Sequence, residues 1–391
     1  MVTEITNISW LSRIGSSIKG VLFGVVLFLA SFVVLWWNEG RAVNESQRIE
    51  RFAAAVSVDT QAVDAANQSK LVHLSGNVTV DGELRDEVLG FSRKGVLKLS
   101  RKCEIYQWTE SVETKSKKKV GGGSTEEKTY NYAQAWVDEP VNSGSFNAPQ
   151  GHENTGSLPF KSGQSIVSQA KLGAFSVQGE LLTKIDNFVP VDLTAEETQA
   201  IKAKLTATLP ATQPSDLAKF GAGEVYLGVN PATPKVGDVR VTLTEVRPGA
   251  VSIIAMQQGP ALAGFSTPNG TICELELGTK SVTEMMSSAQ SRNALFTWIL
   301  RLVGFVAMAI GIGLVFRPLT VVADVVPIFG DILSAGAGLL SIAIALPLSL
   351  LTIAIAWVFY RPVLGIGLLA GALAIFVALF LLARKRKKAT A

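Results

Sequence analysis

The sequence predicts an integral membrane protein with four α-helical transmembrane spans and a large, β-rich exoplasmic domain of mixed α+β structure. Charged residues make up only 17% of the 391 residues, below the roughly 25% that is usual in soluble proteins. Hydrophobic residues make up 48%, and they concentrate near the two ends of the chain. The region between them alternates apolar and polar residues, which is typical of strands with one buried face.

The first apolar stretch, residues 18–37, predicts a transmembrane helix that is retained in the protein. At about 1.5 Å per residue it covers the ~30 Å hydrocarbon core of a bilayer. It ends in Trp36 and Trp37, which suit the interfacial belt and form a poor signal-peptidase site. The predicted membrane-interface anchors are Trp36, Trp37, Glu39 and Arg41. Glu39 and Arg41 either pair with each other or dock the exoplasmic domain against the membrane.

Three further apolar stretches near the carboxyl terminus each fit a membrane crossing: residues 294–316, 332–360 and 363–383. Pro347 supplies a kink point in the second of these. Basic residues precede the first span of the chain and follow the last, which predicts that both termini are cytoplasmic. The cytoplasmic parts are then residues 1–17, a linker at 317–331 and a basic tail at 384–391, and residues 38–293 form the exoplasmic domain, in a lumen or a periplasm.

Within the exoplasmic region, strands are predicted from Leu71 to Val80 and along "GDVRVTLTEV", and a helix begins at Thr194, which has capping-box spacing to Glu197. Residues 117–123, "KKKVGGG", predict a mobile, solvated hairpin tip; contact with lipid headgroups or with an acidic partner is the alternative. Cys103 and Cys273 are either a disulfide or two free buried thiols.

Residues that could carry catalysis are scarce. The sequence contains neither a Walker A loop, a GxSxG elbow nor an HExxH motif. His152, Glu153 and Ser157 lie within a short stretch, where His152 either belongs to a hydrolytic dyad or anchors a turn through a hydrogen bond. We expect no enzyme, no cofactor and no metal centre. Nucleic-acid binding is also not expected, because no base-reading motif or extended basic face is present.

The membrane part carries two patterns. The candidate intramembrane polar residues are Arg301, Asp324 and Asp331. Either they belong to an interfacial segment whose acids pair with Arg317 or Arg301, or they line a path for ions or protons. Small residues recur four apart, which lets helices approach closely within the bundle or between copies. These candidate packing residues are Ala307, Gly311, Ser334, Gly338, Gly367 and Gly371.

Seven stretches, in order along the chain, resemble the LUMA family of four-span membrane proteins: "WWNEGRAV", "KLVHLSG", "EIYQWTE", "YNYAQAWVDEPVNSGSF", "GHENTGSLPF", "VGDVRV" and "IAWVFYRPVLG". The resemblance implies one amino-terminal helix, a large lumenal domain and three carboxyl-terminal helices. Animal members reside in the endoplasmic reticulum and inner nuclear membrane, where they associate with themselves, emerin and lamins. Bacterial members would reside in the inner (plasma) membrane. The resemblance implies no catalytic residues.

Three hypotheses of function follow. The first is an oligomeric scaffold in the lipid bilayer that organises membrane proteins, with protein or lipid partners bound by the exoplasmic domain. The second is a channel, transporter or accessory subunit that uses Arg301, Asp324 and Asp331. The third is an exoplasmic enzyme around His152 or Cys103.

Overall fold

The computed structural model describes residues 2–209, 218–367 and 370, which fall into two compact units. The strand unit comprises Met1–Glu4, Arg51–Glu113 and Lys128–Met286. The helical unit comprises Ile5–Glu50, Thr114–Glu127 and Ser287–Ala391. The helical unit is therefore built from three separate parts of the sequence, and the middle part is the tip of a long hairpin.

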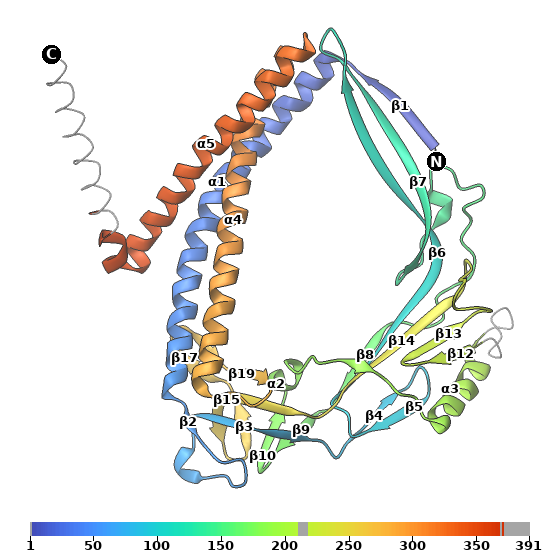
Figure 1. Ribbon diagram of the computed structural model, residues 1–391, viewed down its shortest axis with the longest axis vertical. Coiled ribbons are helices and arrows are strands. Elements are labelled where there is room, and N and C mark those ends of the chain that lie inside the picture. Colours follow the sequence, from blue (N-terminus) through green and yellow to red (C-terminus); the bar gives the residue numbers. More distant parts are fainter. Residues whose placement is uncertain (1, 210–217, 368–369, 371–391) are drawn as a thin grey trace. The chain divides into compact units, whose positions relative to one another are not determined.

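Three long helices run side by side in the helical unit (Figure 1): α1 (Trp10–Glu50), α4 (Val282–Ala323) and α5 (Pro327–Tyr360). Each is long and apolar enough to cross a membrane, and they are the three such helices among the described residues. The prediction of four is not matched in number, because most of residues 363–383 lie outside the described part of the chain.

The helices extend beyond the apolar stretches that predicted them. α4 continues through Pro318 to Ala323, and α5 already begins at Pro327. The predicted linker at 317–331 is therefore helical except for a short turn at 324–326. Hydropathy marks where apolar side chains end, whereas a helix continues for as long as its backbone hydrogen bonds do.

Glycine allows α1 and α4 to approach closely. An added Cβ at Gly311 would lie 2.8 Å from the carbonyl oxygen of Gly24, and one at Gly24 would lie 2.8 Å from the carbonyl oxygen of Gly311. Neither position can carry a side chain without moving a helix. The other small-residue pairs differ: Gly338 and Gly367 face open space, and Gly371 lies outside the described residues.

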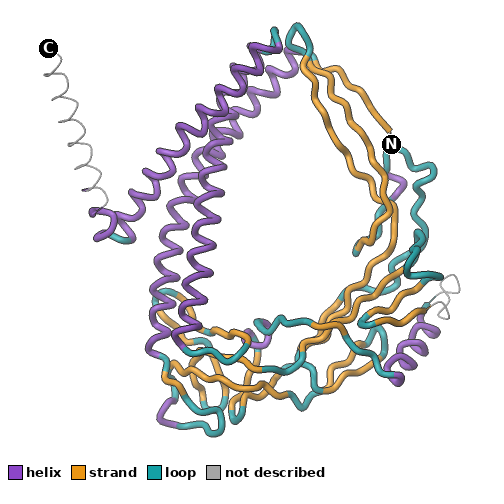
Figure 2. The backbone as a smooth tube through the Cα atoms, viewed as in Figure 1, coloured by secondary structure: helices purple, strands orange, loops and turns teal. Residues whose placement is uncertain are grey.

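The strand unit and the hairpin contribute to two large sheets. Counted over the described residues, the first has eight strands: β1 (Val2–Ile8), β7 (Ser124–Val137), β6 (Lys98–Lys118), β14 (Val239–Val246), β13 (Glu224–Leu227) and β12 (Ala218–Gly221) in that order, with β11 (Val189–Pro190) on β14 and β8 (Gly163–Ile166) on β6. The second has seven: β19 (Glu274–Leu277), β15 (Ala250–Gln258), β16 (Ala261–Ala263), β10 (Phe175–Gln178), β9 (Gln169–Leu172), β3 (Leu71–Thr79) and β2 (Val56–Ser57). Two small hairpins pair β4 (Glu83–Asp86) with β5 (Phe91–Lys94) and β17 (Phe265–Thr267) with β18 (Gly270–Ile272). Strands are coloured orange in Figure 2.

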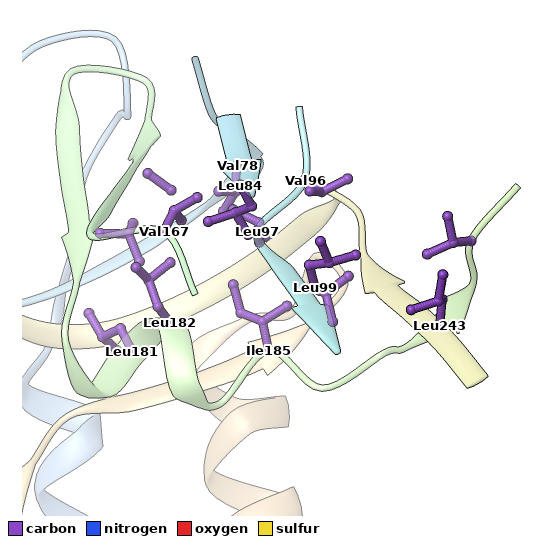
Figure 3. Close-up of a cluster of buried hydrophobic side chains, with 14 of the residues drawn as sticks. Val78, Leu84, Val96, Leu97, Leu99, Val167, Leu181, Leu182, Ile185 and Leu243 are labelled. Carbon is purple, nitrogen blue, oxygen red and sulfur yellow. The ribbon is translucent and has the colours of Figure 1, made fainter. Parts of the chain in front are cut away.

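Alternating side chains of these strands form the core of the strand unit. In β14, Val239, Val241 and Leu243 are buried while the residues between them are not, which confirms the alternation seen in the sequence. Figure 3 shows Leu243 in the same cluster as Leu99 of β6. Each such side chain contributes about 1.5–3 kcal/mol when fully buried.

The short helices of the strand unit are α2 (Glu180–Thr183) and α3 (Ala195–Thr208). The predicted capping box is confirmed, because the side chains of Thr194 and Glu197 each bond the backbone N–H of the other. Ile201 and Leu205, one turn apart on α3, are fully buried. The strand-rich, mixed α+β character predicted for the middle of the chain is therefore found.

Candidate functional site

Glu39 of α1 is a carboxylate buried among the three long helices. Its side chain is 1% exposed. Arg301 of α4 donates to both of its oxygens, from Nε to Oε1 at 2.7 Å and from Nη2 to Oε2 at 2.8 Å. Trp357 of α5 donates its indole N–H to Oε2 at 2.6 Å. One carboxylate thus links α1, α4 and α5 through charge-assisted hydrogen bonds.

Two aromatic rings cover the guanidinium of Arg301. Its central carbon lies 4.8 Å from the ring centroid of Trp298 and 5.5 Å from that of Trp357. Cations attract the faces of tryptophan rings, most strongly when water is excluded. The positive charge is therefore matched by Glu39 on one side and by two ring faces, and we call Glu39, Arg301 and Trp357 the carboxylate cluster.

The residues around the carboxylate cluster continue the polar packing. The Asn38 amide donates to the carbonyl oxygen of Thr297 at 3.1 Å, and Arg41 donates to the Thr297 hydroxyl at 2.8 Å. Arg41 also donates to the side-chain oxygen of Asn293 at 3.1 Å. The end of the first predicted span is thus joined to α4 by neutral and charged hydrogen bonds.

The predicted membrane-interface anchors have other partners in the structure than the sequence suggested. Glu39 pairs with Arg301 and not with Arg41, and Arg301 does not pair with the acids of the predicted linker. Trp36 packs on the ring of Phe359 at 5.1 Å between centroids, whereas Trp37 stays exposed. Trp357 was not among the predicted site residues, although it lies in the stretch "IAWVFYRPVLG" that resembles the LUMA family. The available signal was the opposite charge of Glu39, just past the first apolar stretch, and Arg301, inside the second.

A second ionic cluster lies at the other end of α1, where Asp324 is 2% exposed. Arg13 of α1 donates to its Oδ2, and the Lys118 ammonium lies 2.7 Å from its Oδ1. Lys118 also donates to Asp331 at 2.8 Å. One of the two predicted alternatives paired these acids with Arg317 or Arg301; in the structure they pair with Arg13 and Lys118 instead. We call Arg13, Lys118, Asp324 and Asp331 the tip cluster.

The hairpin tip between β6 and β7 is docked by its backbone as well. The Gly121 N–H donates to the carbonyl oxygen of Val325 at 3.0 Å, and Arg13 donates to that of Gly122 at 2.6 Å. Gly122 has φ +80°, and a Cβ there would lie 2.3 Å from the Trp10 ring. The tip was predicted to be a mobile, solvated loop; it instead contacts an acidic partner within the same chain.

This docking bears on the predicted sidedness. Residues 114–127 touch the amino-terminal end of α1 and the α4–α5 turn within the helical unit. The tip is predicted to belong to the exoplasmic domain, and residues 1–17 and 317–331 are predicted to be cytoplasmic. Both assignments stay predictions, and the contact between these residues allows each to be tested against the other. The rule that assigns sides counts basic residues beside the spans and is blind to such contacts.

The remaining candidates for chemistry are structural side chains in the strand unit. Cys103 and Cys273 are buried free thiols, so the disulfide is not formed, and burial raises the pKa of Cys103 to about 11. The His152 ring stacks on Tyr132 with centroids 3.9 Å apart and donates from Nδ1 to the Ala148 carbonyl at 2.9 Å. Of the two alternatives for His152, a hydrolytic dyad or a hydrogen bond that anchors a turn, the structure shows the second. No cluster of three metal-ligating side chains occurs within residues 2–209, 218–367 and 370.

Comparison with known proteins identifies the family. The model of the family described as transmembrane protein 43 matches residues 105–362. Transmembrane protein 43 of Rattus norvegicus is 32% identical over 374 residues, which cover 92% of this chain and 89% of the rat protein. Transmembrane protein 43 of Homo sapiens is 31% identical over 375 residues, which cover 93% of this chain and 89% of the human protein. The Drosophila melanogaster homolog is 28% identical over 364 residues, 90% and 92%. No solved structure matches. The chain is thus a membrane protein that belongs to the transmembrane protein 43 family, for which LUMA is another name.

Proposed function

We propose that the protein is a non-enzymatic membrane scaffold that assembles with further copies of itself and organises partner proteins in the bilayer. The carboxylate cluster is the observation that supports this most. Every charge in it is paired inside the bundle, and Glu39 bonds two other helices at once. Such a bundle keeps its helices in one register, as an assembly platform requires.

The outer faces of the helices suit assembly. Large apolar side chains stay exposed on α1, such as Leu22 and Phe23, and on α4, such as Leu302. In a bilayer these side chains contact either lipid tails or helices of a partner. The strand unit offers an additional surface for protein partners, among which emerin and lamins are the ones that the family resemblance implies.

Transport remains the second candidate function, and the geometry supports it less. The residues expected to line a polar path do not form one set, because Arg301 pairs with Glu39 whereas Asp324 and Asp331 pair with Arg13 and Lys118. Neutralised, tightly bonded ion pairs bind a passing ion less readily than an unpaired charge does. A transporter would have to break these pairs in each cycle.

One preparation tests both functions. The full chain is purified in mild detergent, the mass of the intact complex is determined, and the same sample is reconstituted into liposomes for ion flux. A stable oligomer in silent liposomes supports the scaffold. A monomer whose liposomes show flux, lost in Asp324→Asn and Arg301→Gln variants, would overturn it in favour of transport.

A further inference from the structure

A cavity of about 410 Å³ opens beside the tip cluster, within the helical unit. That volume lies in the range of about 300–1,000 Å³ that is typical of small-molecule sites. Its wall carries three cations, Arg13, Lys118 and Arg317, and a single acid, Asp324. Asp331, which pairs with Lys118, adds a second negative charge, and the side chains around the cavity still have an excess of positive charge.

The three cations differ in how many of their N–H donors are already used by protein acceptors. Arg13 and Lys118 are held in place by Asp324, and each keeps N–H donors that these contacts do not use. Arg317 is exposed, and within residues 2–209, 218–367 and 370 its guanidinium has neither an ion-pair partner nor a hydrogen-bond acceptor, so none of its five N–H donors is used by that part of the chain. Two oriented cations and one uncommitted arginine are a suitable donor set for a phosphate group, which accepts several charge-assisted hydrogen bonds at once.

Small residues keep the cavity open. Ser334, Ala337 and Gly338 of α5 and Gly313 of α4 form its helical wall. A Cβ added at Gly338 would meet no atom within 4 Å. The Ser334 and Gly338 pair, which the sequence indicates as a helix-packing motif, therefore faces the cavity and not a neighbouring helix.

The cavity also lies where the predicted membrane-spanning stretches begin and end. Arg13 and Ser16 come just before the first apolar stretch, Arg317 comes just after the second, and Ser334 is near the start of the third. Basic pockets between membrane helices bind anionic headgroups on the cytoplasmic side. We propose that this cavity is a phosphate-binding site whose ligand is the headgroup of an anionic phospholipid.

The test measures ligand retention by the full chain in detergent, with native mass spectrometry. Three probes are compared: phosphatidic acid, phosphatidylcholine and inorganic phosphate. We expect phosphatidic acid to be retained and phosphatidylcholine to be lost. Arg317→Gln should weaken retention about tenfold or more, the effect of one hydrogen bond to a charged group.

Two matched variants separate the site from general effects. Gly338→Leu fills the cavity and should abolish retention, whereas Gly336→Leu, also on α5 and also facing open space, should leave it unchanged. Arg361→Gln removes the same charge as Arg317→Gln, beyond the far end of α5, and should have no effect.

The outcomes decide the inference. Retention of phosphatidic acid that is lost in Arg317→Gln and Gly338→Leu alone supports a headgroup site. Binding of inorganic phosphate with the same dependence, without the lipid, keeps the phosphate site but overturns the lipid as its ligand. No retention of either probe, or retention that both Arg317→Gln and Gly338→Leu leave intact, overturns the site.

Discussion

Removing Arg301 should destabilise the helical unit more than removing Glu39 does. In Arg301→Gln, a carboxylate that is 1% exposed loses its ionic partner. Loss of one partner from a buried pair costs about 3–5 kcal/mol in the free energy of unfolding, because the other charge is left without compensation. Glu39→Gln leaves instead an arginine that is 16% exposed and still covered by two tryptophan rings, so its cost should lie below that range.

The double variant measures the interaction itself. Because Glu39→Gln, Arg301→Gln contains two neutral amides of similar length, it should be less damaged than Arg301→Gln alone. The coupling free energy should lie between about 0.5 and 3 kcal/mol, the range for residues in direct contact. Trp357→Phe removes the indole donor together with part of the ring that covers Arg301, so it should cost at least the roughly 1.5–3 kcal/mol expected for a hydrogen bond to a charged group.

The assay is reversible unfolding in mixed detergent micelles, followed by tryptophan fluorescence. Trp298 and Trp357 flank Arg301 and report on the cluster directly. Lys19→Gln, an exposed charge change on α1, serves as the control and should stay within about 0.5 kcal/mol of the parent protein. An Arg301→Gln variant that unfolds like the control would show that Glu39 does not depend on this ion pair. A double variant that loses the sum of the two single losses would show that the two residues are not coupled.

Further predictions concern packing, sidedness and pH. Gly311→Leu should prevent the close approach of α1 and α4 and lower the unfolding midpoint, while Gly336→Leu in open space should not; comparable midpoints would contradict the packing. A thiol-reactive, impermeant label should reach Val120→Cys, whose native side chain is 88% exposed, from the same side as an amino-terminal tag; labelling from the opposite side would contradict the docked tip. Burial lowers the pKa of His73, so the unfolded chain binds more protons just below the ordinary pKa of about 6.5. Stability should therefore be full above that pH and decline as pH falls below it, and His73→Gln should flatten this part of the profile of unfolding midpoint against pH.

The features that the sequence could predict are local ones. Apolar runs located α1, α4 and α5 because a membrane helix must be apolar along its own length. Alternation located β14, because one face of that strand is buried, whereas the first four residues of β3, 71–74, are all buried. The capping box at Thr194 and Glu197 depends on residues three apart, so its spacing alone was sufficient.

The candidate site escaped prediction because its contacts are distant in sequence. Glu39 and Arg301 are 262 residues apart, and nothing near Glu39 distinguishes a residue that meets water from one that meets an arginine. The docking of the hairpin tip could not be predicted either, because its partners are also distant in sequence. A run of lysines followed by glycines has the composition of a solvated loop, and the acids that bind Lys118 lie about 200 residues later in the chain, a separation of 213 for Asp331.

The sequence separation within the carboxylate cluster also sets an order of events during synthesis. A ribosome adds about 5–20 residues per second, so the 262 residues between Glu39 and Arg301 take on the order of 13–50 s. Trp357, a separation of 318 from Glu39, arrives later still. For that interval the first helix must wait in the membrane with an unpaired carboxylate at its end. The hydrogen bonds that join the three helices through Glu39 can therefore form only after both α4 and α5 have been made.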